Sequence, residues 1–100
     1  MNLIYHITTK ENWNIAQQIG YYEVASLAIE GFIHCSTAQQ VAGVLERYYI
    51  GKMDLVILVI DTSKLANKFI YELAPSVNQE FPHIYGTINL DAIIDAINLK

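Results

Sequence analysis

The sequence predicts one small α+β domain spanning residues 1–100, with a mixed, mainly antiparallel sheet and two helices packed on it. The chain has 100 residues, of which 53% are hydrophobic and 16% charged, which suits one compact core and is too apolar for disorder. Strand-like and helix-like stretches also do not alternate regularly along the chain. A doubly wound parallel sheet is therefore the less favoured architecture.

The first strand and first helix are predicted from the N-terminal residues. Residues 3–7 are β-branched and aromatic, which is typical of a strand. Thr8 is followed three positions later by Glu11, a capping-box pattern, so we expect a helix to begin at Thr8. Gly20 is expected to end this helix. Its apolar stripe consists of Trp13, Ala16 and Ile19.

The next segments predict shorter elements and the second helix. Residues 21–24 are expected to be extended, residues 26–30 to form one helical turn closed by Gly31, and residues 32–35 to form a strand. Ser36 or Thr37 is expected to cap a second helix that Gly51 ends. Its apolar positions follow helical spacing: Val41, Val44, Leu45 and Tyr48.

The second half of the chain is expected to be mainly extended. Residues 54–61 contain the continuous apolar run 55–60, which predicts a central strand buried on both faces. The remaining expectations are a strand at 68–73, a polar loop at 74–80, and extended segments at 81–85 and 87–90 around a glycine. Residues 91–99 fit either a helix or a strand, and this alternative stays open.

Composition excludes several classes of partner. The net charge is −4 and the six basic residues are scattered, so electrostatic binding to nucleic acid is not expected. The longest apolar run is far shorter than the roughly 20 residues that span a membrane. The N-terminus lacks a basic region and a cleavage site, and the single cysteine, Cys35, excludes an internal disulfide. We therefore expect a cytoplasmic protein.

Two strands carry the same pattern of apolar residue, histidine, apolar residue and hydroxyl, at residues 5–8 and 33–36. Because alternate residues of a strand share a face, His6 should point the same way as Thr8, and His34 the same way as Ser36. Cys35 should then face the core on the opposite side. Both hydroxyls are expected at helix starts, where free backbone N–H groups favour an anion. The pattern indicates a phosphate or diphosphate site.

The third histidine lies in a Phe-Pro-His-Ile-Tyr-Gly segment at residues 81–86. If this segment is extended, Phe81, His83 and Tyr85 share one face, which suits stacking of a base or nicotinamide ring. Glu72 is the carboxylate that could point into the same cleft. We therefore predict that the three histidines converge on one pocket.

A metal site and purely structural roles are the alternatives for these histidines. Three imidazoles could bind zinc or iron, but their spacing matches no local metal motif and few carboxylates lie nearby in the sequence. We expect no metal and no required cofactor. Any single histidine between apolar residues could instead be a hydrogen-bonded structural residue.

Four segments together resemble the bacterial domain-of-unknown-function family 952, over nearly the whole chain. They are residues 4–8, 31–37, 54–56 and 81–86. That family in turn distantly resembles ADP-ribosyltransferases, which implies a fold of that type. The resemblance implies that His6 holds the nicotinamide ribose of NAD, and leaves Tyr85 and Glu72 as candidates for the stacking tyrosine and the catalytic glutamate.

The leading hypothesis is a small domain that binds a nucleotide-type or phosphorylated ligand, similar to NAD or ADP-ribose. His6 and His34 would hold ribose or phosphate, with His83 and Tyr85 as the third wall, and a histidine would be the acid or base in any reaction. The phosphate would be cradled by Thr8, Ser36 and Thr37. The alternatives are a two-histidine phosphoesterase and a non-enzymatic ligand-binding or interaction module, so enzymatic activity stays open.

Overall fold

The computed structural model describes residues 2–99, and their strand pairings are antiparallel and form three small sheets. The first sheet has the order β1-β4-β8, built from β1 (Leu3–Thr9), β4 (Leu55–Asp61) and β8 (Ile93–Asn98). The second pairs β2 (Tyr21–Tyr22) with β7 (Ile88–Asn89), and the third has the order β3-β6-β5. Its strands are β3 (Ile33–His34), β5 (Phe69–Ala74) and β6 (Gln79–Ile84). The predicted α+β class is confirmed, but three antiparallel sheets replace the single mixed sheet.

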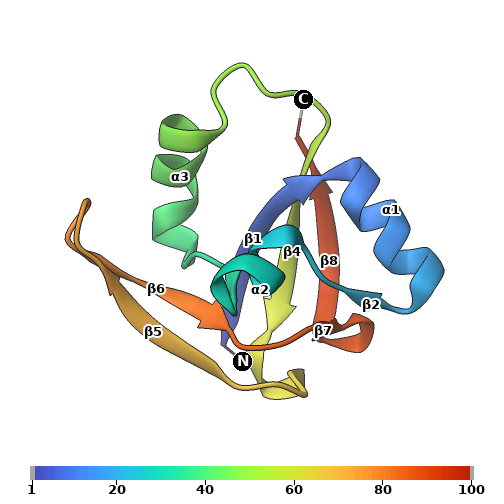
Figure 1. The fold of residues 1–100 in the computed structure, drawn as a ribbon. Helices are drawn as coiled ribbons and strands as arrows, with labels where there is room; N and C mark the ends of the chain where they lie inside the picture. Colours follow the sequence, from blue (N-terminus) through green and yellow to red (C-terminus); the bar gives the residue numbers. More distant parts are fainter. Residues whose placement is uncertain (1, 100) are drawn as a thin grey trace.

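The central position of β4 follows from its continuous apolar sequence. All seven of its residues are buried, and alternate side chains enter two separate core clusters. Val56, Leu58 and Ile60 join the cluster that includes Ala16 of α1, whereas Leu55 and Ile57 join the cluster packed against α3. Figure 1 shows α1 (Lys10–Ile19) and α3 (Val41–Tyr48) on opposite sides of this sheet. The prediction that this strand is buried on both faces is confirmed.

The first helix begins one residue later than the sequence pattern indicated. Its N-cap is Thr9, whose side chain accepts the hydrogen bond from the backbone N–H of Asn12. The Thr8 hydroxyl is buried and accepts from the Asn12 side chain instead. Thr8 belongs to β1, whose pairing with β4 extends to Thr9, so the sheet determines where the helix can begin. Gly20 ends the helix as predicted, in the left-handed conformation.

The other helices are short. The six-residue helix α2 (Ala25–Glu30) is closed by Gly31, and Thr37 caps the 3₁₀ turn η1 (Ala38–Gln40) that leads into α3. That helix ends at Tyr48, before the predicted Gly51, because Tyr49 turns out of the helix and its hydroxyl donates to the carbonyl of Ile7. Two further 3₁₀ turns are η2 (Thr62–Lys64) and η3 (Leu90–Ala92). No helix within residues 2–99 has the length and apolarity needed to cross a membrane.

The C-terminal segment, which the sequence left open between helix and strand, is strand β8. It completes the first sheet by pairing with β4, with an irregularity in register between Val59 and Ile60. The predicted strand at residues 68–73 and the extended segment at 81–85 become β5 and β6, which pair as a hairpin across the predicted loop. In Figure 1 this hairpin projects from the body of the molecule below α3.

Candidate functional site: a three-histidine cavity

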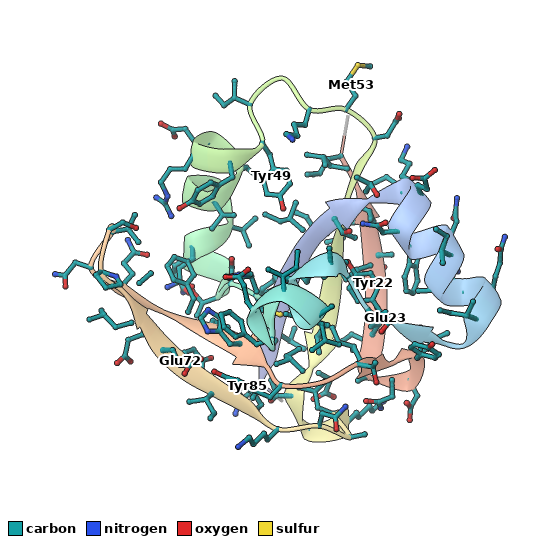
Figure 2. All side chains as sticks on the ribbon, in the orientation of Figure 1. Tyr22, Glu23, Tyr49, Met53, Glu72 and Tyr85 are labelled. Carbon is teal, nitrogen blue, oxygen red and sulfur yellow. The ribbon has the colours of Figure 1, made fainter. Side chains whose placement is uncertain are left out.

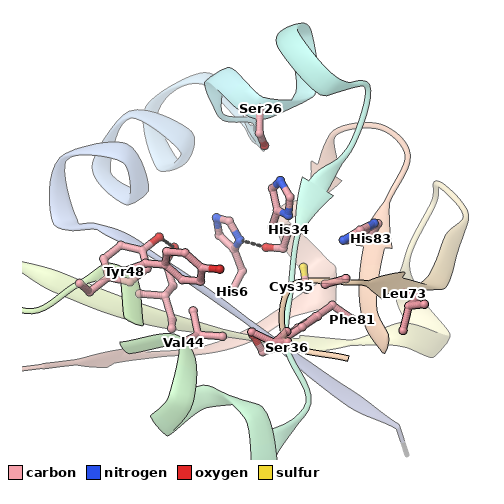
Figure 3. Close-up of a pocket in the computed structure, with 14 residues that line it drawn as sticks. His6, Ser26, His34, Cys35, Ser36, Val44, Tyr48, Leu73, Phe81 and His83 are labelled. Atoms are coloured by element: carbon pink, nitrogen blue, oxygen red, sulfur yellow. Dashed lines mark hydrogen bonds between the residues drawn. The ribbon is translucent and has the colours of Figure 1, made fainter. Parts of the chain in front are cut away.

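A cavity of about 590 Å³ lies between α3, the β5–β6 hairpin and the outer edge of β1. Figure 3 shows that the side chains of all three histidines border it. Its polar lining is completed by Ser26 and Ser36, and its remaining lining is apolar or aromatic: Ile7, Cys35, Val44, Tyr48, Tyr49, Leu73, Ala74, Val77 and Phe81. The volume falls in the range typical of small-molecule sites.

Strand register brings two of the histidines together. His34 is directly opposite His83 in the β3–β6 pair, and directly opposed residues project from the same face of a sheet. Their ring centroids lie 5.1 Å apart, at an interplanar angle of 78°. The two residues belong to segments 49 positions apart in the sequence, so only the fold can create this proximity.

The third histidine joins them because the chain crosses between two sheets just after β3. The N–H of Cys35 still donates to Pro82 of β6 (2.9 Å), whereas the next residue, Ser36, exchanges two backbone hydrogen bonds with Tyr5 of β1 (2.7 and 2.8 Å). This crossing places the backbone carbonyl of His34 2.5 Å from Nδ1 of His6. The convergence of the three histidines on one cavity is therefore built by β1, β3 and β6.

His6 is buried and both of its ring nitrogens are engaged. Nδ1 donates to the carbonyl of His34, so Nε2 is the acceptor for the hydroxyl of Tyr22 at 2.7 Å. Burial is the main cause that lowers the pKa of His6 from 6.5 to about 4, and the hydrogen bond to His34 opposes this only in part. Burial also raises the pKa of Tyr22, which is fully buried. His6 is thus a neutral, fixed group at physiological pH.

His34 is the most open of the three. Its side chain is 53% exposed, and its Nε2 lies 2.9 Å from the carboxylate of Glu30, four residues earlier at the end of α2. The ring of Phe32 meets it edge to face at 4.8 Å. His34 can therefore reach both the solvent and the cavity while it keeps a carboxylate partner.

His83 is hydrogen-bonded to Glu72, which does not line the cavity. Nδ1 of His83 lies 2.7 Å from the Glu72 carboxylate, and the hydroxyl of Tyr85 donates to the same oxygen at 2.5 Å. These two hydrogen bonds, that from Tyr85 first, lower the pKa of Glu72. Phe32 stacks on a face of the His83 ring, with centroids 4.0 Å apart. Figure 2 shows Glu72 and Tyr85 close together beside the β5–β6 hairpin.

The predicted phosphate cradle at two helix starts is not formed around this cavity. Thr8 and Thr37 do not line it, and the capping groups near them are already bonded to protein: Asn12 N–H to Thr9, and Thr37 N–H to Gln40. Ser36 does line the cavity, but its N–H is used by Tyr5. The helix starts therefore satisfy their own backbone groups instead of facing the cavity.

Cys35 departs from the strict alternation expected of its strand. It is buried in the main core cluster, as predicted, yet it also borders the cavity together with its two neighbours. The reason is that β3 ends at His34, and the crossing to β1 interrupts the alternation of faces. Burial raises the pKa of the Cys35 thiol, so this cysteine stays protonated.

Sequence reasoning missed the residues that hold the histidines. Tyr22 and Glu30 each contact one of the imidazoles and Phe32 contacts two, although the sequence patterns single out none of the three as a site residue. Glu30 precedes His34 by four positions, which is a weak local signal. The contact between Tyr22 and His6 joins residues 16 positions apart and leaves no local pattern. Glu72 and Tyr85 do not line the cavity but support His83 from behind.

Few residues that can carry a charge line the cavity. Within residues 2–99, no lysine or arginine lines it, so imidazoles are its only groups that can become cationic. The same range holds no cluster of three or more histidine, cysteine, aspartate or glutamate side chains placed to bind a metal ion. That no metal is required stays a prediction.

Comparison with known proteins assigns the chain to a family. It belongs to the family described as Protein of unknown function (DUF952), whose model matches residues 7–96. Similar solved structures are those of protein CC0527 from Caulobacter crescentus. The crystal structure has 26% identity and a TM-score of 0.89, over 99% of this chain and 87% of that one. The solution structure has 27% identity and a TM-score of 0.85, over 100% and 86%. No curated protein matches the chain.

Proposed function

We propose that the three-histidine cavity binds a small nucleotide-type ligand, with NAD and ADP-ribose as the first candidates. The observation that carries this proposal is the convergence of three imidazoles on one cavity whose remaining lining is largely apolar and aromatic. A nucleotide has two parts that complement this lining. The faces of its base or nicotinamide ring are planar and apolar, whereas its ribose and phosphate are polar. Tyr48 and Phe81 are aromatic residues in this lining, and the proposal has the ring contact them.

Within this proposal, His34 and His83 contact the polar half of the ligand. His6 has both ring nitrogens bonded to protein, so a ribose hydroxyl could bond to it only by displacing Tyr22. His6 therefore supports the site through the carbonyl of His34. Ser36 adds a hydroxyl to the lining of the cavity.

ADP-ribosyl transfer is the chemistry that the sequence resemblance suggests for such a ligand. Its glutamate and tyrosine candidates, Glu72 and Tyr85, bond to each other and support His83 rather than line the cavity. Transfer would thus require the Glu72 carboxylate to leave these partners and reach the ligand. Ligand binding is for this reason the primary proposal, and recovery of NAD unchanged after incubation would favour a non-enzymatic binding module.

Backbone amide NMR titration tests the binding proposal. We expect NAD, ADP-ribose or AMP to shift amides around His34 and His83 in a saturable manner. His34→Ala and His83→Ala should each weaken binding by about 1–3 kcal/mol, the usual cost of losing a hydrogen bond to a charged or buried group. Glu11→Gln, on the exposed side of α1, is the control. Absence of any saturable shift with all three nucleotides would contradict the proposal.

A further inference from the structure

We propose that His83 and His34 act as general base and general acid in the hydrolysis of a nucleoside 2′,3′-cyclic phosphate. This inference rests on the proposed nucleotide site and adds a reaction and a substrate class to it. The observation behind it is that each of these two imidazoles, and not His6, combines a carboxylate partner with one ring nitrogen left over. Their rings also lie 5.1 Å apart at the same cavity.

The surroundings of His83 suit a base. Glu72 is kept ionised by its two hydrogen bonds, so it accepts the Nδ1 proton of His83 and leaves Nε2 as a proton acceptor. Within residues 2–99, Nε2 of His83 has no protein partner, and every fully buried side-chain nitrogen or oxygen there is hydrogen-bonded. Nε2 is therefore accessible to a water molecule or a ligand.

The surroundings of His34 suit an acid. For this role His34 acts as the imidazolium, and its Nε2 lies 2.9 Å from the carboxylate of Glu30, which accepts the Nε2 proton. Nδ1 has no partner among the residues described and can give its proton to a leaving oxygen. The side chain is exposed enough for its proton to be restored from solvent after each turnover.

The charge of the cavity selects the substrate class. Because no lysine or arginine lines it within residues 2–99 and His83 serves as the neutral base, the imidazole of His34 is its available cation, and it already faces a carboxylate. A cyclic phosphodiester carries a single negative charge, so it requires less compensation than a phosphomonoester dianion. Its nucleoside portion would lie against the apolar wall formed by residues such as Val44 and Phe81.

Hydrolysis of the cyclic phosphodiester needs no reactant other than water. Water attacks phosphorus while Nε2 of His83 takes one of its protons, and a new P–O bond forms. The bond between phosphorus and one ribose oxygen breaks, and His34 gives that oxygen a proton. The product is a nucleoside 2′- or 3′-monophosphate, and solvent returns the proton from His83 to His34.

The test follows 2′,3′-cyclic AMP by ³¹P NMR with the purified full chain. We expect conversion to a monophosphate, with kcat lowered about 10²–10⁴-fold in His83→Ala and in His34→Ala. His83→Gln is the second variant for the buried position, since it keeps polarity but cannot serve as a base. Glu72 is a positioning residue, so Glu72→Gln should lower kcat while KM changes little. Glu11→Gln should behave as wild type.

The outcomes separate this inference from the binding proposal. If AMP binds the wild type but cyclic AMP is not hydrolysed, the acid–base inference is overturned and the binding proposal stands. If hydrolysis persists unchanged in His34→Ala/His83→Ala with its amide spectrum preserved, another group or a contaminant is responsible, and the inference is again overturned. If no nucleotide binds at all, both fail together.

Discussion

The imidazole of His34 lies 5.1 Å from that of His83 because the register of β3 and β6 sets the two residues directly opposite each other. A shift of one residue in that register would send the two rings to opposite faces of the sheet. The backbone of His34 is also bonded to His6, so one residue links all three histidines.

Removing the hydroxyl of Tyr22 should destabilise the fold. Tyr22→Phe leaves Nε2 of the buried His6 without its partner, and we expect a loss of about 1–3 kcal/mol in the free energy of unfolding. Urea denaturation measures this loss. Tyr21→Phe is the matched control, because Tyr21 is 40% exposed. Equal stability of the two variants would argue against the bond between Tyr22 and His6.

Stability should fall on mild acidification because of His6. Its pKa is about 4 in the folded protein and 6.5 in the reference state, so the unfolded chain gains the proton first. The stabilisation is fully present above about pH 6.5, declines as the pH falls and is lost near the folded pKa, for a total of about 3 kcal/mol. Urea denaturation between about pH 7.5 and 4.5 follows this decline. In His6→Gln the free energy of unfolding should change less with pH over this range. The same pH dependence in the variant and the wild type would contradict this role of His6.

Tyr85 should control the ionisation of Glu72. Its hydroxyl is the first cause that holds the pKa of Glu72 below the ordinary value, so Tyr85→Phe should raise that pKa. A carboxyl ¹³C NMR titration measures it directly. Tyr71→Phe is the control, because Tyr71 precedes Glu72 on β5 and is 46% exposed, and it should leave the titration unchanged. An unaltered Glu72 titration in Tyr85→Phe would remove the hydroxyl from this role.

Gly86 should be intolerant of a side chain. Its φ is +151°, and a Cβ there would collide with the side chain of Asn67, which donates to the carbonyl of Thr87. Gly86→Ala should cost about 1–3 kcal/mol in unfolding experiments. Gly43→Ala in α3 is the opposite case, since its Cβ meets only the flexible end of Arg47, and it should stabilise by up to about 1 kcal/mol. Similar effects of both changes would refute this account.

Cys35 should be inert in the folded protein. It is 3% exposed, and burial raises the pKa of its thiol, so a thiol-specific reagent should label it only after unfolding in urea. Cys35→Ala should also leave nucleotide affinity nearly unchanged. Rapid labelling without urea would show that the cavity opens as far as this sulfur.

Local sequence patterns predicted much of the fold for a clear physical reason. Continuous burial of β4 follows from its apolar run, and the left-handed ends at Gly20 and Gly31 follow from the conformational freedom of glycine. These features depend on a residue and its immediate neighbours. The same kind of evidence failed at Thr8, because the pairing of β1 with β4 outweighed the local capping pattern.

The sequence by itself therefore determined which segments are apolar and extended, and that its histidines lie between apolar neighbours. Only the tertiary structure decided that the C-terminal segment is a strand, because its local preferences were balanced and the open edge of β4 selected pairing. Tertiary structure also decided the separate roles of the histidines. Tyr22 hydrogen-bonds to Nε2 of His6. Glu30 contacts one ring nitrogen of His34 and Glu72 one of His83, so that within residues 2–99 each of these two rings keeps one nitrogen that is not bonded to protein. Such contacts depend on register and on the crossing of the chain between sheets, which no short segment encodes.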